Sequence, residues 1–291
     1  MRVNKKSLVI AIACNILWGV LPPFWHLLAD VDPLVVLCCR FVASLAVTLC
    51  ILAISGRMQT FRDTLKSPSA MRCLVPAAFI VTLNWGIYIW AVNAGHILDC
   101  SIGYYMNPLM GFALGVLIFR EKCTKLQLAA VALAVIGVAI SVIAFGTFPF
   151  ISVILALTFA MYGLFKKKAH ADPVAGIAAE TLVITPFALA FLFIFKMDSI
   201  RAASLVDLLL LVGTGVVTAI PLFLYARSVN DIPFVIVSFL FYLCPILIMI
   251  YGIISGEVMS TSQLISFIFI GLGLIVFSIA LVKNTKTENA A

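Results

Sequence analysis

Isolated charged residues interrupt the long apolar stretches of this 291-residue chain, and they are the first candidates for chemistry. Arg40 lies seven residues beyond Pro33 in the second such stretch. A cation at that depth costs roughly 2.5–3.5 kcal/mol on membrane-insertion scales, so it should face a partner or a wet cavity. We expect Arg40 to bind an anionic group of a substrate or to pair with an internal acid. A fixed ion pair or carbonyl anchor between helices is the alternative.

Three titratable residues are candidates for coupling or gating. Glu180 lies seven residues beyond Pro173, at a position that corresponds to Arg40. His96 and Asp99 precede or begin the fourth apolar stretch. Groups of this kind can take up a charge or a proton when their surroundings change.

Polar and aromatic residues at i, i+4 spacing share helix faces in four of the stretches. Such faces could line an apolar pocket that has a few hydrogen-bonding points. Hydrogen bonding between packed helices is the alternative for any single member. With Arg40, the predicted substrate-binding residues are Asn84, Trp85, Tyr88, Ser101, Tyr105, Thr218, Tyr225, Ser238 and Tyr242.

The composition indicates what must position these side chains. Hydrophobic residues make up 64% of the chain, charged residues make up 11%, and the mean hydropathy is +1.21. A soluble domain is about half apolar and a quarter charged. The composition therefore excludes a soluble enzyme, a nucleic-acid-binding module and a disordered chain. The net charge is +7, and the lysines and arginines lie in short loops between the apolar stretches. Their placement indicates how the chain is oriented in a membrane.

The apolar stretches predict an all-α integral membrane protein with ten transmembrane helices, each long enough to span a bilayer. The predicted helices cover residues 7–28, 33–54, 73–93, 97–119, 125–144, 148–165, 174–195, 205–226, 232–255 and 261–282.

Positive charges set the expected orientation. With the N-terminus inside, 16 of the 19 lysines and arginines fall in cytoplasmic segments and only Lys196 and Arg201 fall outside. This bias predicts cytoplasmic termini and a multi-pass protein of the bacterial inner membrane.

The two halves of the chain resemble each other. Asp32-Pro33 corresponds to Asp172-Pro173, and Glu121 and Glu257 are each followed sixteen residues later by glycine. The collinear matches predict two five-helix repeats, residues 1–145 and 146–291. Because five is odd, the second repeat enters the membrane from the opposite side. Inverted repeats are typical of secondary transporters that work by alternating access.

Other residues have a structural and a functional interpretation. Pro22-Pro23, Pro108, Pro221 and Pro245 are predicted to break or kink helices. Gly111 and Gly115 allow close packing, which we expect inside the chain rather than in a dimer, so a monomer or weak dimer is predicted. Glu121 and Glu257 are expected to be exposed charges at helix ends, or else a pair of gates.

No metal-ligand spacing, nucleophile motif or nucleotide-binding loop is visible in the sequence, so neither an enzyme nor a cofactor is predicted. The expected partners are a small-molecule substrate and the lipid bilayer. Without a nucleotide-hydrolysing site, transport would use a gradient, exchange or downhill flow.

Several motifs resemble the RarD branch of the EamA family, in the drug/metabolite transporter superfamily. The most specific is NWGIYIWAVNAGHILDCSIGYYMNPL, from Asn84 to Leu109. LWGVLPPFWHLL from Leu17, MYGLFKK from Met161 and GVVTAIPL from Gly215 support it, and the resemblance covers essentially the whole chain. It implies ten helices in two inverted repeats, a central cavity, and efflux of small metabolites or drugs.

The chain departs from this resemblance in two places. Asp99 stands where similar sequences usually have Glu, and Phe241 stands where they commonly have Gln. The second change removes a hydrogen-bonding amide from the expected pocket.

The sequence therefore predicts a secondary transporter that exports a small polar or zwitterionic metabolite or drug. Import or exchange of a metabolite is the alternative within transport. A non-transporting membrane scaffold or lipid-handling protein is the alternative of another class.

Overall fold

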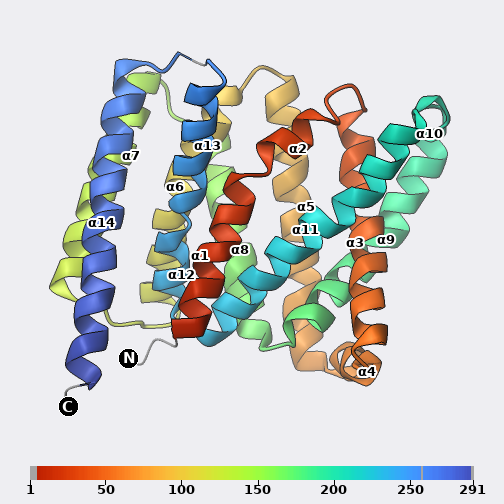
Figure 1. Cartoon of the computed structure of the whole chain (residues 1–291), viewed down its shortest axis with the longest axis horizontal. Coiled ribbons are helices and arrows are strands. Elements are labelled where there is room, and N and C mark those ends of the chain that lie inside the picture. Colours follow the sequence, from red (N-terminus) through yellow and green to blue (C-terminus); the bar gives the residue numbers. More distant parts are fainter. Residues whose placement is uncertain (1–4, 257, 290–291) are drawn as a thin grey trace. The chain divides into compact units, whose positions relative to one another are not determined.

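The computed structural model describes residues 5–256 and 258–289, and all regular structure in these ranges is α-helical (Figure 1). The predicted all-α class is confirmed for them. The helices are α1 (Lys5–Gly19), α2 (Pro22–His26), α3 (Pro33–Ile54), α4 (Met58–Lys66), α5 (Pro68–Asn93), α6 (Ile97–Leu117), α7 (Lys125–Phe145), α8 (Phe150–Ala169), α9 (Pro173–Phe195), α10 (Met197–Ala202), α11 (Leu205–Asp231), α12 (Phe234–Leu240), α13 (Leu243–Ile254) and α14 (Thr261–Asn289).

Within the described residues, nine helices or consecutive helix pairs are long and apolar enough to cross a membrane. The predicted fourth span corresponds to α6, which has 21 residues but is not one of the nine. Asp99, Asn107 and Pro108 lower its hydropathy. Ten spans therefore remain a prediction. The nine are α1 with α2, α3, α5, α7, α8, α9, α11, α12 with α13, and α14.

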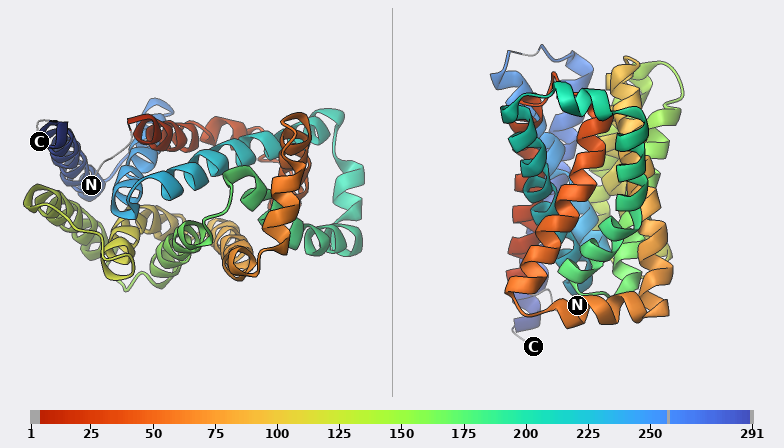
Figure 2. Two further views of the ribbon diagram at one scale, coloured as in Figure 1. Left: turned by 90° about the horizontal axis from the view of Figure 1, so that it is seen from below. Right: turned by 90° about the vertical axis from the view of Figure 1, so that its right-hand side faces the viewer.

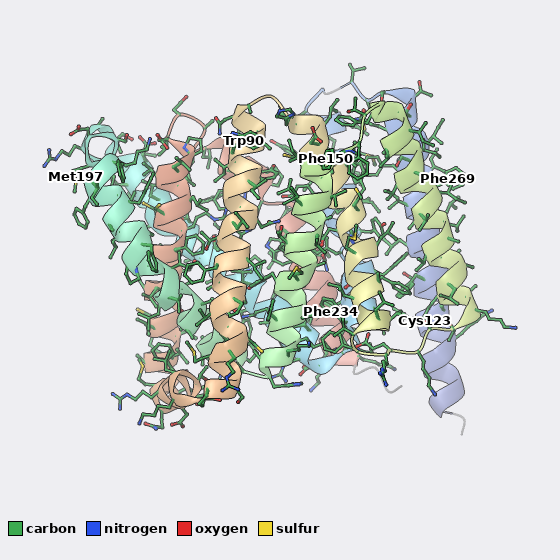
Figure 3. The ribbon with its side chains drawn as sticks, turned by 180° about the vertical axis from the view of Figure 1, so that it is seen from behind. Trp90, Cys123, Phe150, Met197, Phe234 and Phe269 are labelled. Atoms are coloured by element: carbon green, nitrogen blue, oxygen red, sulfur yellow. The ribbon has the colours of Figure 1, made fainter. Side chains whose placement is uncertain are left out.

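Large apolar side chains are exposed on the outer faces of the helices. Trp90 near the end of α5 is 56% exposed and Phe150 at the start of α8 is 69% exposed (Figure 3). Extensive apolar exposure is unfavourable in water and suits contact with lipid. The chain is thus built as a multi-pass membrane protein.

Two of the helices expected from the hydropathy pattern are interrupted. The predicted helix 7–28 is divided into α1 and α2, with the break just before Pro22. The predicted helix 232–255 is divided into α12 and α13, shortly before Pro245. A proline has no backbone N–H to donate to the carbonyl four residues earlier, so it weakens the preceding helical turn. The expected prolines that lie inside uninterrupted helices are Pro108 and Pro221.

The segment from Ser55 to Arg72, which the sequence suggests is a loop, contains the short helix α4. Phe61 is buried against Leu52 and Leu74, and α4 lies across the end of α3 (Figure 2). Its other face is polar and exposed. Because α4 is short and has only one apolar face, the hydropathy pattern does not predict it.

The chain forms two compact units. Unit 1 contains residues 1–20, 91–160 and 231–291, and unit 2 contains residues 21–90 and 161–230. Each unit combines segments from both halves of the sequence.

In unit 2, α3 packs against α9 in an antiparallel pair. Asp32 caps the first turn of α3 and also binds Lys196 at the end of α9. Asp172 caps α9 in the same way and binds Arg57, just beyond α3. Each aspartate therefore combines a helix cap with an ion pair to the neighbouring helix.

In unit 1, glycines allow close packing of two helix pairs. A Cβ at Gly273 of α14 would lie 2.8 Å from the Ala130 carbonyl oxygen of α7, and these two helices lie side by side in Figures 1 and 2. A Cβ at Gly111 of α6 would lie 2.5 Å from Ser238 Oγ of α12. The glycine motif of α6 therefore packs inside the unit, as expected.

Glu121 does not behave as the expected exposed charge. Its two carboxylate oxygens accept hydrogen bonds from the backbone amides of Phe234 and Val235, both at 2.8 Å. The carboxylate thereby caps the first turn of α12, where the helix dipole favours a negative charge. Its predicted counterpart Glu257 lies outside the described residues.

Candidate functional site

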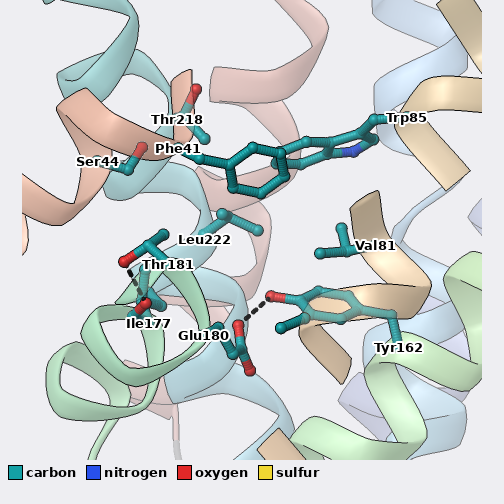
Figure 4. A pocket seen from close by; sticks show the side chains of 11 residues that line it. Phe41, Ser44, Val81, Trp85, Tyr162, Ile177, Glu180, Thr181, Thr218 and Leu222 are labelled. Atoms are coloured by element: carbon teal, nitrogen blue, oxygen red, sulfur yellow. Dashed lines mark hydrogen bonds between the residues drawn. The ribbon is translucent and has the colours of Figure 1, made fainter. Parts of the chain in front are cut away.

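A pocket lies inside unit 2, among side chains of α3, α5, α8, α9 and α11 (Figure 4). It encloses about 290 Å³ of empty space, its opening included, yet has room for about one water molecule. A larger occupant would need its walls to move apart. The lining residues are Phe41, Ser44, Ala78, Val81, Trp85, Tyr162, Ile177, Glu180, Thr181, Thr218 and Leu222.

Glu180 supplies a carboxylate to one wall of the pocket. It is 4% exposed, and its Oε1 accepts a hydrogen bond of 2.9 Å from Lys166 Nζ. Its Oε2 accepts a second one, of 3.2 Å, from the hydroxyl of Tyr162. The carboxylate is thus held by two donors from α8, one charged and one neutral.

Lys166 corrects a sequence-based expectation. The three consecutive lysines from Lys166 to Lys168 are predicted to lie in a cytoplasmic segment, but α8 continues to Ala169 and Lys166 is 4% exposed. A run of like charges gives no sign that one member turns inward. The signal available was the i, i+4 spacing from Tyr162, which puts both side chains on one helix face.

Arg40 is held by aromatic rings next to the pocket. Its guanidinium carbon lies 4.0 Å from the centre of the Trp85 ring and 4.6 Å from that of Trp25. Its Nε donates a hydrogen bond of 3.1 Å to Thr218 Oγ1. Cation–π contacts of this kind stabilise a desolvated cation. Trp85 and Thr218 line the pocket, so Arg40 contacts two lining residues without being one of them.

Trp25 is absent from the predicted set because it follows the break before Pro22. A helix that continued through this point would have presented the indole in a different direction. Sequence reasoning therefore could not assign it to the Arg40 site.

Three other predicted residues of unit 2 do not line this pocket. Asn84 and Tyr225 are buried, and Tyr88 is partly buried. The ring of Tyr225 stacks on that of Tyr162, with centres 6.1 Å apart. Tyr225 thus supports the residue that binds Glu180.

The remaining predicted binding residues belong to unit 1. The Tyr242 hydroxyl donates to the backbone carbonyl of Tyr105 at 3.0 Å. Ser238 packs against Gly111, and Ser101 donates to the carbonyl of Ile97 one turn earlier. A single cavity shared by these residues and the pocket of unit 2 stays a prediction.

His96 and Asp99 form a separate pair in unit 1. His96 Nδ1 lies 3.3 Å from Asp99 Oδ2, with the imidazole exposed and the carboxylate buried. The Ser152 hydroxyl donates to the Asp99 backbone carbonyl at 2.7 Å. The role of this pair in coupling stays a prediction.

Known proteins resemble the chain over nearly its whole length. The sequence profile of the EamA-like transporter family matches residues 5–143 and 148–279, one range in each sequence half. The uncharacterized transporter YojE of Bacillus subtilis is 36% identical over 294 residues, which covers 99% of this chain and 98% of YojE.

Two proteins named RarD are also similar. That of Streptomyces exfoliatus is 35% identical, over 84% of this chain and 78% of its own length. That of Escherichia coli is 28% identical, over 94% of each chain.

A crystal structure of another protein has the same fold. It superposes with a TM-score of 0.74 at 14% sequence identity, covering 95% of this chain and 98% of its own. With the sequence relatives, this establishes both family and fold. The chain belongs to the EamA-like transporter family and is a RarD-type member of it.

Proposed function

We propose that the chain is a secondary transporter that exports a small zwitterionic metabolite, such as an amino-acid-like compound, by alternating access. The observation that carries this proposal is the pocket of unit 2, which has Glu180 in its lining and Arg40 in contact with two other lining residues, Trp85 and Thr218. Two opposite charges beside one pocket complement a molecule that carries both an ammonium and a carboxylate.

The walls between the two charges favour a compact substrate. Phe41 and Trp85 supply aromatic surface, with ring centres 5.5 Å apart, and Ser44 and Thr218 supply hydroxyls. In the pocket an ammonium would approach Glu180, and a carboxylate would approach the guanidinium of Arg40. Arginine suits the second task because its planar fork binds a carboxylate through two parallel hydrogen bonds.

Alternating access accounts for the small size of the pocket. A cavity with room for about one water molecule corresponds to a closed conformation. In the proposed cycle the lining helices separate toward one side of the membrane and then toward the other. The antiparallel α3 and α9 would contribute equivalent positions from repeats 1–145 and 146–291.

The proposed location is the bacterial inner membrane, with both termini in the cytoplasm. The excess of lysine and arginine in alternate loops supports this orientation even with Lys166 removed from the count. Export is proposed because the resemblance to the RarD branch implies it. His96 and Asp99 are the proposed coupling groups outside the pocket.

Export is tested by comparing the metabolites outside cells that express the wild-type chain or Arg40→Ala at equal membrane abundance. Trp90→Ala is the matched control, because Trp90 is an aromatic residue on the exposed face of α5. We expect one zwitterionic metabolite to accumulate outside cells with the wild type and Trp90→Ala, and not with Arg40→Ala. Identical media from all three strains would contradict export.

A further inference from the structure

Lys166 and Glu180 place two opposite charges in the interior of unit 2, at 3% and 5% side-chain exposure. Their separation of 2.9 Å is that of a direct charged hydrogen bond. Burying such a pair is costly, and removing one partner leaves an uncompensated charge that costs more. The cost of burying this pair beside a pocket suggests that the pair has a function there.

The two oxygens of Glu180 have different surroundings. Oε2 binds the hydroxyl of Tyr162, and Tyr162 lines the pocket (Figure 4). Oε1 binds Lys166, which does not line the pocket. Lys166 Nζ lies 3.6 Å from the position of a Cβ on Gly176, in the first turn of α9. A cation in the pocket would thus approach the carboxylate on the side of Tyr162.

We propose that Lys166 is an internal substitute for the ammonium group of the substrate. In the empty transporter Lys166 neutralises Glu180, and a bound substrate ammonium takes over this role from the pocket side. This inference rests on the proposed transport function and specifies the substrate class: molecules with an ammonium group.

The ammonium of Lys166 can move away from Glu180 because Lys166 lies near the end of α8. It lies three residues before the helix end at Ala169, and its four-carbon side chain can extend toward the helix end when the carboxylate releases it. Lysines near helix ends commonly extend their ammonium toward water in this manner.

The proposal separates two modes of transport. Net transport requires the empty protein to change conformation with Glu180 neutralised by Lys166. Exchange of one substrate molecule for another needs no conformational change of the empty protein, because a substrate ammonium is bound during each change. A variant without Lys166 should therefore retain exchange and lose net transport.

The test uses the full-length purified chain in liposomes with a mixture of radiolabelled amino acids as the probe. Uptake into amino-acid-loaded liposomes measures exchange, and efflux into amino-acid-free buffer measures net transport. For Lys166→Gln we expect the exchange rate to stay within about twofold of the wild type. Net transport should fall by at least about tenfold, because the buried carboxylate of Glu180 is then unpaired in the empty protein. Lys168→Gln, a neighbouring exposed lysine, should change neither.

A second variant keeps the test decisive if Lys166→Gln does not fold. Lys166→Arg retains the charge and can bind Glu180 through two hydrogen bonds, so it should be harder to displace. We expect an unchanged thermal unfolding midpoint and a KM for exchange raised by about tenfold. N-acetylated amino acids, which lack the ammonium, should not be exchanged by the wild type.

The outcomes separate the two proposals. Equal loss of exchange and net transport in Lys166→Gln, or an unchanged KM in folded Lys166→Arg, would overturn the role of Lys166 and leave the transport function standing. No amino-acid flux by the wild type in either mode would overturn both.

Discussion

The ammonium of Lys196 lies 2.6 Å from the carboxylate of Asp32, so that the first residue after α9 is bound to the cap of α3. At the other end of the same pair, Arg57 binds Asp172, the cap of α9. Each aspartate therefore both begins one helix and fixes the end of its neighbour. Within unit 2 these two contacts hold α3 and α9 in register as an antiparallel pair.

The pair of Asp32 and Lys196 should make stability depend on pH. Burial on its own would raise the pKa of Asp32, but Lys196 and the amides of Leu34 and Val35 outweigh it and the pKa is lowered. Because an unfolded Asp titrates near pH 3.9, the contribution is complete above that pH and is lost as the pH falls through the lower, folded pKa. It should amount to about 1 kcal/mol or less, since both groups are partly exposed.

Asp32→Asn isolates the charge, because asparagine also caps helices. We expect a small decrease in the thermal unfolding midpoint in detergent at pH 7, and a shallower loss of stability below about pH 4 than in the wild type. An identical pH dependence in the two proteins would contradict the assignment.

Local signals in the sequence predicted part of this structure well. The Asp-Pro pairs at Asp32 and Asp172 predict helix starts because the aspartate cap and the fixed φ of proline act within one turn. The glycine spacing in α6 predicts close packing for a similarly local reason.

Contacts between distant segments could not be predicted in this way. Glu121 caps α12, which is more than a hundred residues away, so no local pattern records the contact. Lys166 turns inward only because Glu180 is brought beside it by α9. The cation–π site of Arg40 depends on Trp25, whose direction is set by a break in the helix.

The contact between α7 and α14 depends on the absence of a side chain at Gly273. A Cβ there would lie 2.8 Å from a backbone carbonyl oxygen of α7, which cannot rotate away, so Gly273→Ala should destabilise the protein by about 1–3 kcal/mol. Gly271→Ala on the same helix meets nothing within 4 Å and should be neutral or stabilising by up to about 1 kcal/mol. Unfolding midpoints in detergent measure both, and equal midpoints would refute the packing role.

The cap that Glu121 provides to α12 should be worth about 0.5–2 kcal/mol. Glu121→Ala removes both acceptors and should lose that amount, whereas Glu121→Gln retains one acceptor and should lose less. Thermal unfolding of the two variants ranks the effects. Equal stabilities for alanine and wild type would show that the two backbone amides are satisfied without Glu121.

The aromatic site of Arg40 should tolerate no other cation. Lysine keeps the charge but neither stacks between Trp25 and Trp85 nor donates from an Nε, so Arg40→Lys should reduce transport by about a hundredfold while the protein folds. Transport by liposomes containing the folded variant measures this. Wild-type rates for Arg40→Lys would rule out a specific role for the guanidinium.

Thr218 offers a finer change at the same place. Thr218→Val removes only the hydroxyl that accepts from Arg40, so it should reduce transport by about tenfold with little change in fold. Thr158→Val is the control, because that hydroxyl donates to a carbonyl within its own helix.

In the proposed function, the pocket of unit 2 carries a zwitterion across the membrane. The most direct measurement is uptake of radiolabelled amino acids by liposomes that contain the purified chain, compared with liposomes that contain Glu180→Gln. We expect saturable uptake with the wild type, which N-acetylated amino acids do not inhibit, and a loss of at least about tenfold with Glu180→Gln. Non-saturable uptake, or equal uptake by both proteins, would contradict the claim.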